Sequence, residues 1–143
     1  MERIQQKIGR IREYLELLKS LEEDCRKRFH TDPLYRGALL HYLYLMADSC
    51  LALAEMVIKF NDLRLPQTYA EAIDILGENG ILEPSFAYQF AKIAGFRNFL
   101  AHDYEQVDAG LICEEILSRL GDVETFVAQI AAFVSTGQPD SQN

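Results

Sequence analysis

The sequence predicts an all-α protein, an antiparallel bundle of about five helices. Apolar residues recur at steps of three and four along most of the chain, which is the spacing of amphipathic helices. Capping residues precede several of these segments, and no segment alternates apolar and polar residues for long enough to predict a strand. The 143 residues, 49% of them hydrophobic, suffice for one domain with its own core. We expect this domain to cover residues 1–136.

The first two helices are predicted on either side of a short turn. The first should end near His30, and its apolar residues keep helical spacing with one gap at Glu22. They are Ile4, Ile8, Ile11, Leu15, Leu18, Cys25 and Phe29. Asp32 followed by Pro33 is typical of an N-cap with proline at the first helical position. This second helix should run to residues 58–61, and because apolar residues surround it, we expect it to be the central helix.

A short third helix is predicted after a capping box. Thr68 and Glu71 have the spacing in which a hydroxyl and a carboxylate each accept a backbone N–H at a helix start. The helix should stop at Gly77, because glycine is common just past helix ends. Glu78-Asn79-Gly80 then predicts a turn.

Two further helices complete the domain. The fourth should begin at Glu83-Pro84-Ser85, and the fifth should extend from about Asp108 to Val134, with Gly121 as the candidate interruption. The polar tail, Gly137 to Asn143, is predicted to be disordered.

Cysteine usage and hydropathy predict a soluble, cytoplasmic protein. Cys25, Cys50 and Cys113 are odd in number and lack the paired spacing of a zinc or redox site, so we expect reduced core residues. No uncharged apolar run is long enough to cross a membrane, and no basic leader precedes an apolar block.

The net charge of −8 argues against tight, nonspecific binding of nucleic acid. A local cationic cleft is still compatible with this charge, because fields are screened beyond about 8–10 Å at physiological salt. The candidate cations, which can equally be ordinary solvated side chains, are Arg3, Lys7, Arg10, Arg12, the Arg26-Lys27-Arg28 run and Lys92.

One octapeptide, from Arg97 to Tyr104, gathers polar groups in an apolar helical segment. The helical progression Phe86, Phe90, Ile93, Leu100 also passes through Arg97 and Tyr104. A guanidinium on such a core-facing stripe is costly unless an anionic group meets it. Asn98 and His102 are four residues apart and should share a neighbouring face, while Arg97 and Tyr104, seven apart, should be nearly eclipsed. We therefore expect the polar groups to converge on one side of the helix.

The pattern Arg97, Asn98, His102 and Tyr104 resembles the Arg-x-x-x-x-His-x-Tyr motif of the HepT toxins, a family of HEPN ribonucleases. The resemblance covers nearly the whole chain in size and helical character, although only the octapeptide is specific. It implies a HEPN-type bundle, a homodimer whose two motifs face a shared cleft, and an endoribonuclease toxin of a type VII toxin–antitoxin system. tRNA and mRNA are both reasonable substrates.

The octapeptide carries the groups that RNA cleavage without a metal requires. Histidine suits the transfer of protons from the ribose 2′-hydroxyl and to the departing 5′-oxygen, because its unperturbed pKa is near 6.5. Arg97 offers a planar donor fork for phosphate, and Asn98 can bind the same phosphate or fix the tautomer of His102. One chain has only one histidine in the cluster, so the dimer implied by the resemblance would supply the second. Arg97, Asn98 and His102 are the predicted catalytic residues.

Tyr104 has two possible roles. From the residues alone it is either a core residue or a cleft residue whose hydroxyl binds phosphate. The resemblance implies a sharper role, since HepT-like toxins are paired with a minimal nucleotidyltransferase antitoxin of the MNT type that can attach AMP to the motif tyrosine. The added phosphate would then lie in the RNA cleft against Arg97.

Alternatives to the ribonuclease interpretation remain open at this point. In a purely structural interpretation, Arg97 pairs with an acidic residue, Asn98 is solvated and His102 ends the helix. The second functional class is a noncatalytic HEPN module that binds a nucleotidyltransferase or its substrate. Elsewhere, His30 beside a helix end and His41 on an apolar helix are predicted to be structural. No phosphate loop or metal-binding motif is present, so no cofactor or metal is predicted.

Overall fold

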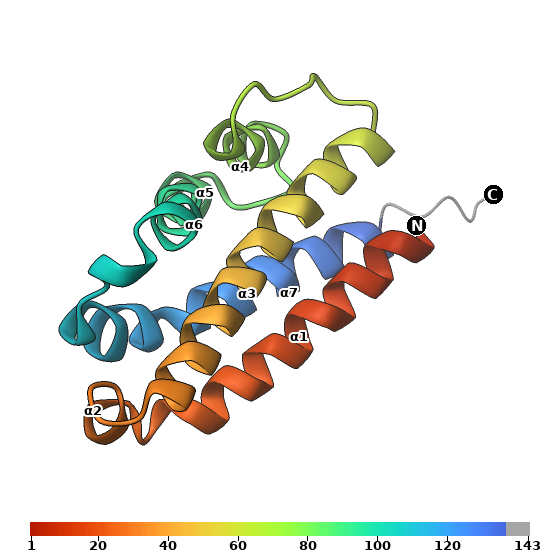
Figure 1. The fold of residues 1–143 in the computed structure, drawn as a ribbon. Helices are drawn as coiled ribbons and strands as arrows, with labels where there is room; N and C mark the ends of the chain where they lie inside the picture. The colour runs from red at the N-terminus through yellow and green to blue at the C-terminus, as the bar shows by residue number, and fades with distance from the viewer. Residues whose placement is uncertain (137–143) are drawn as a thin grey trace.

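The computed structural model describes residues 1–136, and these form a helical bundle built around one long central helix (Figure 1). That helix, α3, packs against α1 on one side and against α4 and α6 on the other. The last helix, α7, packs against α1, and α5 packs against α4. The α-helices are α1 (Glu2–Glu22), α2 (Cys25–Arg28), α3 (Pro33–Phe60), α4 (Tyr69–Glu78), α5 (Pro84–Phe90), α6 (Ile93–His102) and α7 (Leu120–Thr136). The predicted all-α class is confirmed, and the predicted tail at residues 137–143 lies outside the described residues.

The predicted first helix is divided into α1 and α2, at the gap in its apolar stripe. The helix ends at Glu22, and a turn through Glu23 and Asp24 leads to α2. The predicted apolar residues are nevertheless all buried, including Cys25 and Phe29 of the second segment. The continuous helix to His30 was therefore wrong, because an exposed glutamate at position 22 gives that turn nothing to pack against the core.

The boundaries predicted from capping residues are confirmed for α3 and α4. The Asp32 carboxylate accepts the Tyr35 N–H at 3.1 Å, and α3 ends at Phe60. The Thr68 hydroxyl accepts the Glu71 N–H at 3.0 Å at the start of α4. The Glu71 carboxylate accepts the backbone N–H of Gln67, whereas in a capping box it would accept the N–H of the N-cap residue Thr68.

The turn after α4 also follows the prediction, and two glycines explain why. α4 includes Gly77 and ends one residue later than predicted, at Glu78. A Cβ on Gly77 would lie 2.7 Å from the Cβ of Ala87 on α5, so the close approach of the two helices requires glycine there. Gly80 has a φ of +71°, which glycine adopts without strain. Together they allow α5 to fold back closely against α4.

The predicted fourth helix is also divided, into α5 and α6. The helix begins at Pro84, as predicted, and the Glu83 carboxylate caps α5 by accepting the Phe86 N–H at 2.9 Å. At the break, the N–H groups of Ala94 and Gly95 bond to carbonyls only three residues back, which tightens the chain and redirects it. Phe90 stacks on Phe126 of α7 with ring centroids 4.7 Å apart, so packing on α7 fixes the direction of α5.

Irregular turns separate α6 from α7, and the last two of them stand where the predicted fifth helix should begin. A 3₁₀ turn, η1 (Tyr104–Gln106), is followed by a π-helical turn, η2 (Leu111–Ile116), and a second 3₁₀ turn, η3 (Leu117–Arg119). The interruption therefore precedes α7 and does not fall at Gly121, which lies inside α7. Asp108 marks the start as predicted, because its carboxylate accepts the Leu111 N–H at 3.0 Å.

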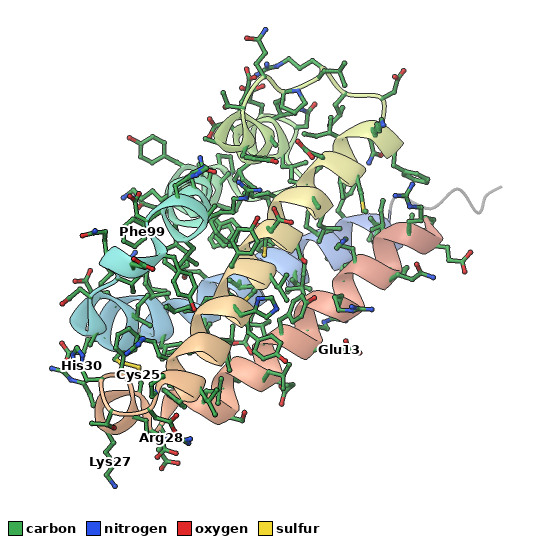
Figure 2. The ribbon with its side chains drawn as sticks, in the orientation of Figure 1. Glu13, Cys25, Lys27, Arg28, His30 and Phe99 are labelled. Carbon is green, nitrogen blue, oxygen red and sulfur yellow. A yellow bond between two sulfur atoms is a disulfide. The ribbon has the colours of Figure 1, made fainter. Side chains whose placement is uncertain are left out.

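Two of the three cysteines form a disulfide, which corrects the prediction that all are reduced. Cys25 of α2 is bonded to Cys113 of η2 with Cα atoms 5.6 Å apart (Figure 2). The pair is 88 residues apart in sequence, so spacing along the chain held no sign of it. Cys50 alone fits the prediction; it is a free, buried thiol whose pKa is raised above its usual range by burial.

We expect reduction of this disulfide to lower the free energy of unfolding by about 2–4 kcal/mol, because the bond closes a long loop in the unfolded chain. Urea unfolding with and without dithiothreitol measures the difference. A Cys113→Ser variant should match the reduced wild type and should not respond to dithiothreitol. Equal stabilities of the oxidised and reduced wild type would contradict the expectation.

No helix within residues 1–136 combines the length and apolar character needed to cross a bilayer.

Candidate active site

Arg97 lies on α6 with its side chain only 19% exposed, and its guanidinium meets the anion that the sequence required. Its Nε donates to the Asp48 carboxylate of α3 at 3.0 Å. Partial burial by itself lowers the pKa of Arg97, but the hydrogen bond to Asp48 raises it above the ordinary arginine value. The side chain is therefore a fixed cation at physiological pH.

Two tyrosine rings and one amide complete the surroundings of this guanidinium. Its Cζ lies 5.3 Å from the ring centroid of Tyr44 on α3 and 5.1 Å from that of Tyr69 on α4. Its Nη1 donates to the Asn98 side-chain oxygen at 3.1 Å. Within residues 1–136 no protein group accepts a hydrogen bond from Nη2. The protein therefore holds Arg97 firmly and leaves one edge of its donor fork available to an anion.

Asn98 and His102 stand on α6 one turn apart, and both are exposed. This is the shared face predicted from their spacing. His102 is the last residue of α6, and no hydrogen bond or ion pair engages it within the described part of the chain. All three features of the purely structural interpretation are thus present. The ribonuclease interpretation additionally requires exposed polar groups beside the arginine, and Asn98 and His102 provide them.

Tyr104 departs from its predicted position. The eclipsing of Arg97 and Tyr104 requires a continuous helix, but α6 ends at His102, and Asp103 has φ −120° and ψ 31°. Tyr104 lies in η1, 44% exposed, and its hydroxyl is 3.9 Å from the place where a Cβ on Gly37 would be. Gly37 and Asp48 are eleven positions apart on α3, about 16 Å at 1.5 Å per residue. The phenol and the guanidinium therefore occupy two neighbouring sites, and the predicted convergence of all four polar residues does not extend to Tyr104.

A pocket of about 500 Å³ opens beside the Arg97 site, between the start of α4 and α6. Its lining residues are Glu55, Pro66, Gln67, Thr68, Tyr69, Ala70, Ala94, Gly95 and Asn98. Sequence reasoning did not find Tyr69, Tyr44 or Asp48, because they come from other helices. Asp48 carried a usable signal, since it is a charged residue amid the apolar residues of the central helix.

Several of the candidate cations are engaged by carboxylates away from Arg97. Three of them pair with carboxylates elsewhere: Arg10 with Glu13, Arg26 with Glu114, and Arg28 with Asp32. These exposed pairs neutralise much of the charge that a cationic cleft would have used.

The other two histidines are both exposed beside an aromatic ring. His41 is exposed on α3, and its ring lies 5.5 Å from that of Tyr42. His30 is exposed after α2 and meets the Phe29 ring edge-on. Within residues 1–136 no group of three or more His, Cys, Asp or Glu side chains is arranged to hold a metal ion.

An all-helical bundle with an arginine, asparagine and histidine at the end of one helix and a tyrosine just beyond it defines a HEPN-type ribonuclease domain. The ribonuclease HepT-like family matches residues 5–130. The chain therefore belongs to the HepT-like ribonuclease family, which confirms the family and enzyme class predicted from the octapeptide.

Two relatives are similar in sequence. The mRNA nuclease HepT of Shewanella oneidensis is 22% identical over 126 residues, which cover 88% of this chain and 94% of that protein. The tRNA nuclease HepT of Aphanizomenon flos-aquae is 35% identical over 69 residues, or 48% of this chain and 47% of that protein.

Solved structures share the fold. The tri-AMPylated Shewanella oneidensis HEPN toxin in complex with MNT antitoxin superposes with a TM-score of 0.80 at 22% identity, covering 90% of this chain and 96% of that chain. YutE, a cytosolic protein of unknown function from Bacillus subtilis, superposes with a TM-score of 0.81 at 19% identity. The match covers 95% of this chain and 91% of that chain. At these identities the likeness establishes the HEPN-type fold.

Proposed function

We propose that this chain is the metal-independent endoribonuclease toxin of a HEPN–MNT toxin–antitoxin pair acting in the cytoplasm. The observation that carries the proposal is the held cation: Arg97 is fixed by Asp48 and two tyrosine rings while one edge of its fork is free, beside exposed Asn98 and His102. The similar proteins named as HepT nucleases, and the AMPylated toxin bound to an MNT antitoxin, support this choice over a noncatalytic module.

In the proposed reaction the ribose 2′-oxygen attacks the adjacent phosphorus as the bond to the departing 5′-oxygen breaks. One His102 accepts the 2′-hydroxyl proton, and a second His102 protonates the 5′-oxygen. Arg97 donates through Nη2 to the phosphate oxygens, where negative charge develops, and Asn98 provides an amide donor on the same side. The product ends in a 2′,3′-cyclic phosphate, and no step needs a metal ion.

This division of roles requires two chains, because one chain has a single histidine at the site. We therefore propose a homodimer in which the α6 faces of two protomers, each with Asn98 and His102, border one cleft. Phe99, only partly buried on α6, adds apolar surface for such an interface.

Mixed dimers test the proposal directly. A dimer of one wild-type chain and one His102→Ala chain retains a single histidine in the shared cleft, although the proposed mechanism uses two. We expect this mixed dimer, purified through two different affinity tags, to cleave RNA at least about tenfold more slowly than the wild-type dimer, whereas a separate site in each chain would keep half of the wild-type rate, with EDTA present throughout.

The measurements are the rate on labelled RNA and the chemistry of the product ends. A mixed dimer that keeps half of the wild-type rate would contradict the shared cleft, and so would a monomeric mass at micromolar concentration. Cleavage that stops in EDTA and returns with added metal would contradict the metal-independent mechanism.

The antitoxin in this proposal is a minimal nucleotidyltransferase that transfers AMP to Tyr104. The phenol is 44% exposed at the end of the motif, so another protein's active site can reach it. Oxygen Oη of Tyr104 attacks the α-phosphorus of ATP, the bond to the β-phosphate breaks, pyrophosphate leaves with the bonding electrons, and the phenol proton passes to solvent. A phosphodiester of tyrosine and AMP results.

A further inference from the structure

A second pocket, of about 420 Å³, lies at the corner where Tyr104 ends the motif. Its walls come from the end of α2, the first turns of α3 and the segment that follows α6. The lining residues are Phe29, His30, Arg36, Tyr104, Glu105 and Val107. Figure 2 shows His30 and Cys25 together at this corner, while Lys27 and Arg28 point away from it. This volume is near the lower end of the roughly 300–1,000 Å³ typical of small-molecule sites, so it suits one nucleotide.

The α2 side of this pocket is anchored next to it. The Cys25–Cys113 disulfide links α2 to η2, which follows the lining segment 104–107, and Arg26 bonds Glu114 across the same junction at 2.6 Å. These links restrain the chain on two sides of the pocket, which reduces the ordering that a ligand must impose.

Arg36 is the cation of this pocket. Its Nη1 donates to the Phe29 carbonyl at 3.1 Å, and its Cζ lies 5.9 Å from the centroid of the Phe29 ring. Within residues 1–136 no protein acceptor or carboxylate engages its Nε or Nη2. Arg36 thus has donors for a phosphate and a fixed position from which to present them. Glu105 is the one carboxylate among the lining residues, and it limits the net positive charge.

The acceptor oxygen lies beside the turn of α3 that carries this cation, and both side chains line the pocket. The Tyr104 hydroxyl faces Gly37, the residue that follows Arg36. A phosphorus bonded to that oxygen would be next to the backbone that carries the guanidinium. Around 16 Å of α3 separates it from the Asp48 that holds Arg97.

We propose that this α2–α3 corner pocket is an adenylate-docking site, and that the first AMP added to Tyr104 lies in it. Arg36 binds the phosphodiester, and the exposed His30 ring offers a face on which the adenine stacks. This inference deepens the proposed function, since it rests on Tyr104 being the AMP acceptor. It also revises the expectation that the added phosphate lies against Arg97.

Free AMP tests the pocket without the antitoxin and without nuclease activity. In ¹H–¹⁵N spectra of the full chain, AMP should shift amides of residues 29–37 and 104–107, and adenosine should do so at least about tenfold more weakly, because it lacks the phosphate. Arg36→Gln should weaken AMP binding about tenfold or more. Arg10→Gln, a change of an exposed arginine on α1, should leave it unchanged. Amide shifts centred on residues 94–102 would overturn the proposal, and so would the absence of any shift when AMP is added.

A second pair of variants probes the space beside the phenol. Only the Tyr104 hydroxyl lies within 4 Å of a Cβ added at Gly37, so Gly37→Ala fits at ordinary contact distance. Gly37→Leu places a larger side chain against the Tyr104 hydroxyl and should weaken AMP binding at least about tenfold relative to Gly37→Ala. Circular dichroism should show that both variants are folded. Equal AMP affinities of these two variants would contradict the assigned location.

An experiment on protein that carries AMP on Tyr104 distinguishes an error in the docking site from an error in the proposed AMP transfer. After treatment with a minimal nucleotidyltransferase and ATP, AMP on Tyr104 should be released by a phosphodiesterase at least about tenfold faster from Arg36→Gln than from wild type. Equal release rates would overturn docking while leaving the modification intact. If no AMP is added to Tyr104, the proposed regulation is wrong, and the spectra with free AMP still decide the pocket.

Discussion

Replacing His102 with alanine is expected to lower the rate of RNA cleavage by about 10²–10⁴-fold while leaving the fold intact, because the change removes a proton-transfer group from both protomers. His102 is exposed at the end of α6 and engages no hydrogen-bond partner within the described chain, so its loss removes no packing. The measurement is the single-turnover rate on labelled RNA, with the melting temperature recorded for each variant. His41→Ala, which alters another exposed histidine, is the matched control and should keep the wild-type rate.

Arg97 needs a more careful comparison, because Arg97→Ala leaves Asp48 without its partner. Arg97→Lys retains a cation but loses the planar fork, so it should remain folded and still lose most activity. A His102→Ala or Arg97→Lys protein that cleaves at the wild-type rate would show that the active site lies elsewhere.

Replacing Tyr104 with phenylalanine is expected to abolish AMP transfer and leave a toxin that the antitoxin cannot silence covalently. The change removes only the nucleophilic oxygen and keeps the ring in its place beside Gly37. Intact-mass and peptide spectrometry after incubation with a cognate minimal nucleotidyltransferase, ATP and magnesium measure the transfer, and growth assays measure toxicity.

Tyr88→Phe is the control for this experiment, since Tyr88 is 73% exposed on α5 and thus more accessible than Tyr104. We expect Tyr88→Phe to accept AMP as the wild type does. AMP found on Tyr88 or Tyr69, or on the Tyr104→Phe protein, would contradict the assignment of Tyr104.

The sequence predicted those features that depend on interactions between residues close together in the chain. Asp32 and Thr68 cap α3 and α4 as expected, because their side chains bond to N–H groups only three residues away. The same holds for the shared face of Asn98 and His102, which depends only on the helical repeat. The octapeptide itself identified the family.

The positions where α1–α2 and α5–α6 break could not be predicted in the same way. Helical periodicity continues across the α5–α6 break, and at the α1–α2 break its one sign is the gap at Glu22. Packing against other helices decides where the chain turns. Phe90 against Phe126 is one such contact, between residues 36 positions apart.

By itself, the sequence determined the helical class, the capped boundaries, the HepT-like family and the cation, amide and imidazole of the motif. Only the tertiary structure decided that Asp48, Tyr44 and Tyr69 hold Arg97, that Cys25 bonds Cys113, and that Tyr104 turns away to a separate pocket. The physical reason is the range of the interactions. Caps and helical faces are set within one or two turns, whereas ion pairs, disulfides and pockets depend on helices that meet only after the chain has folded.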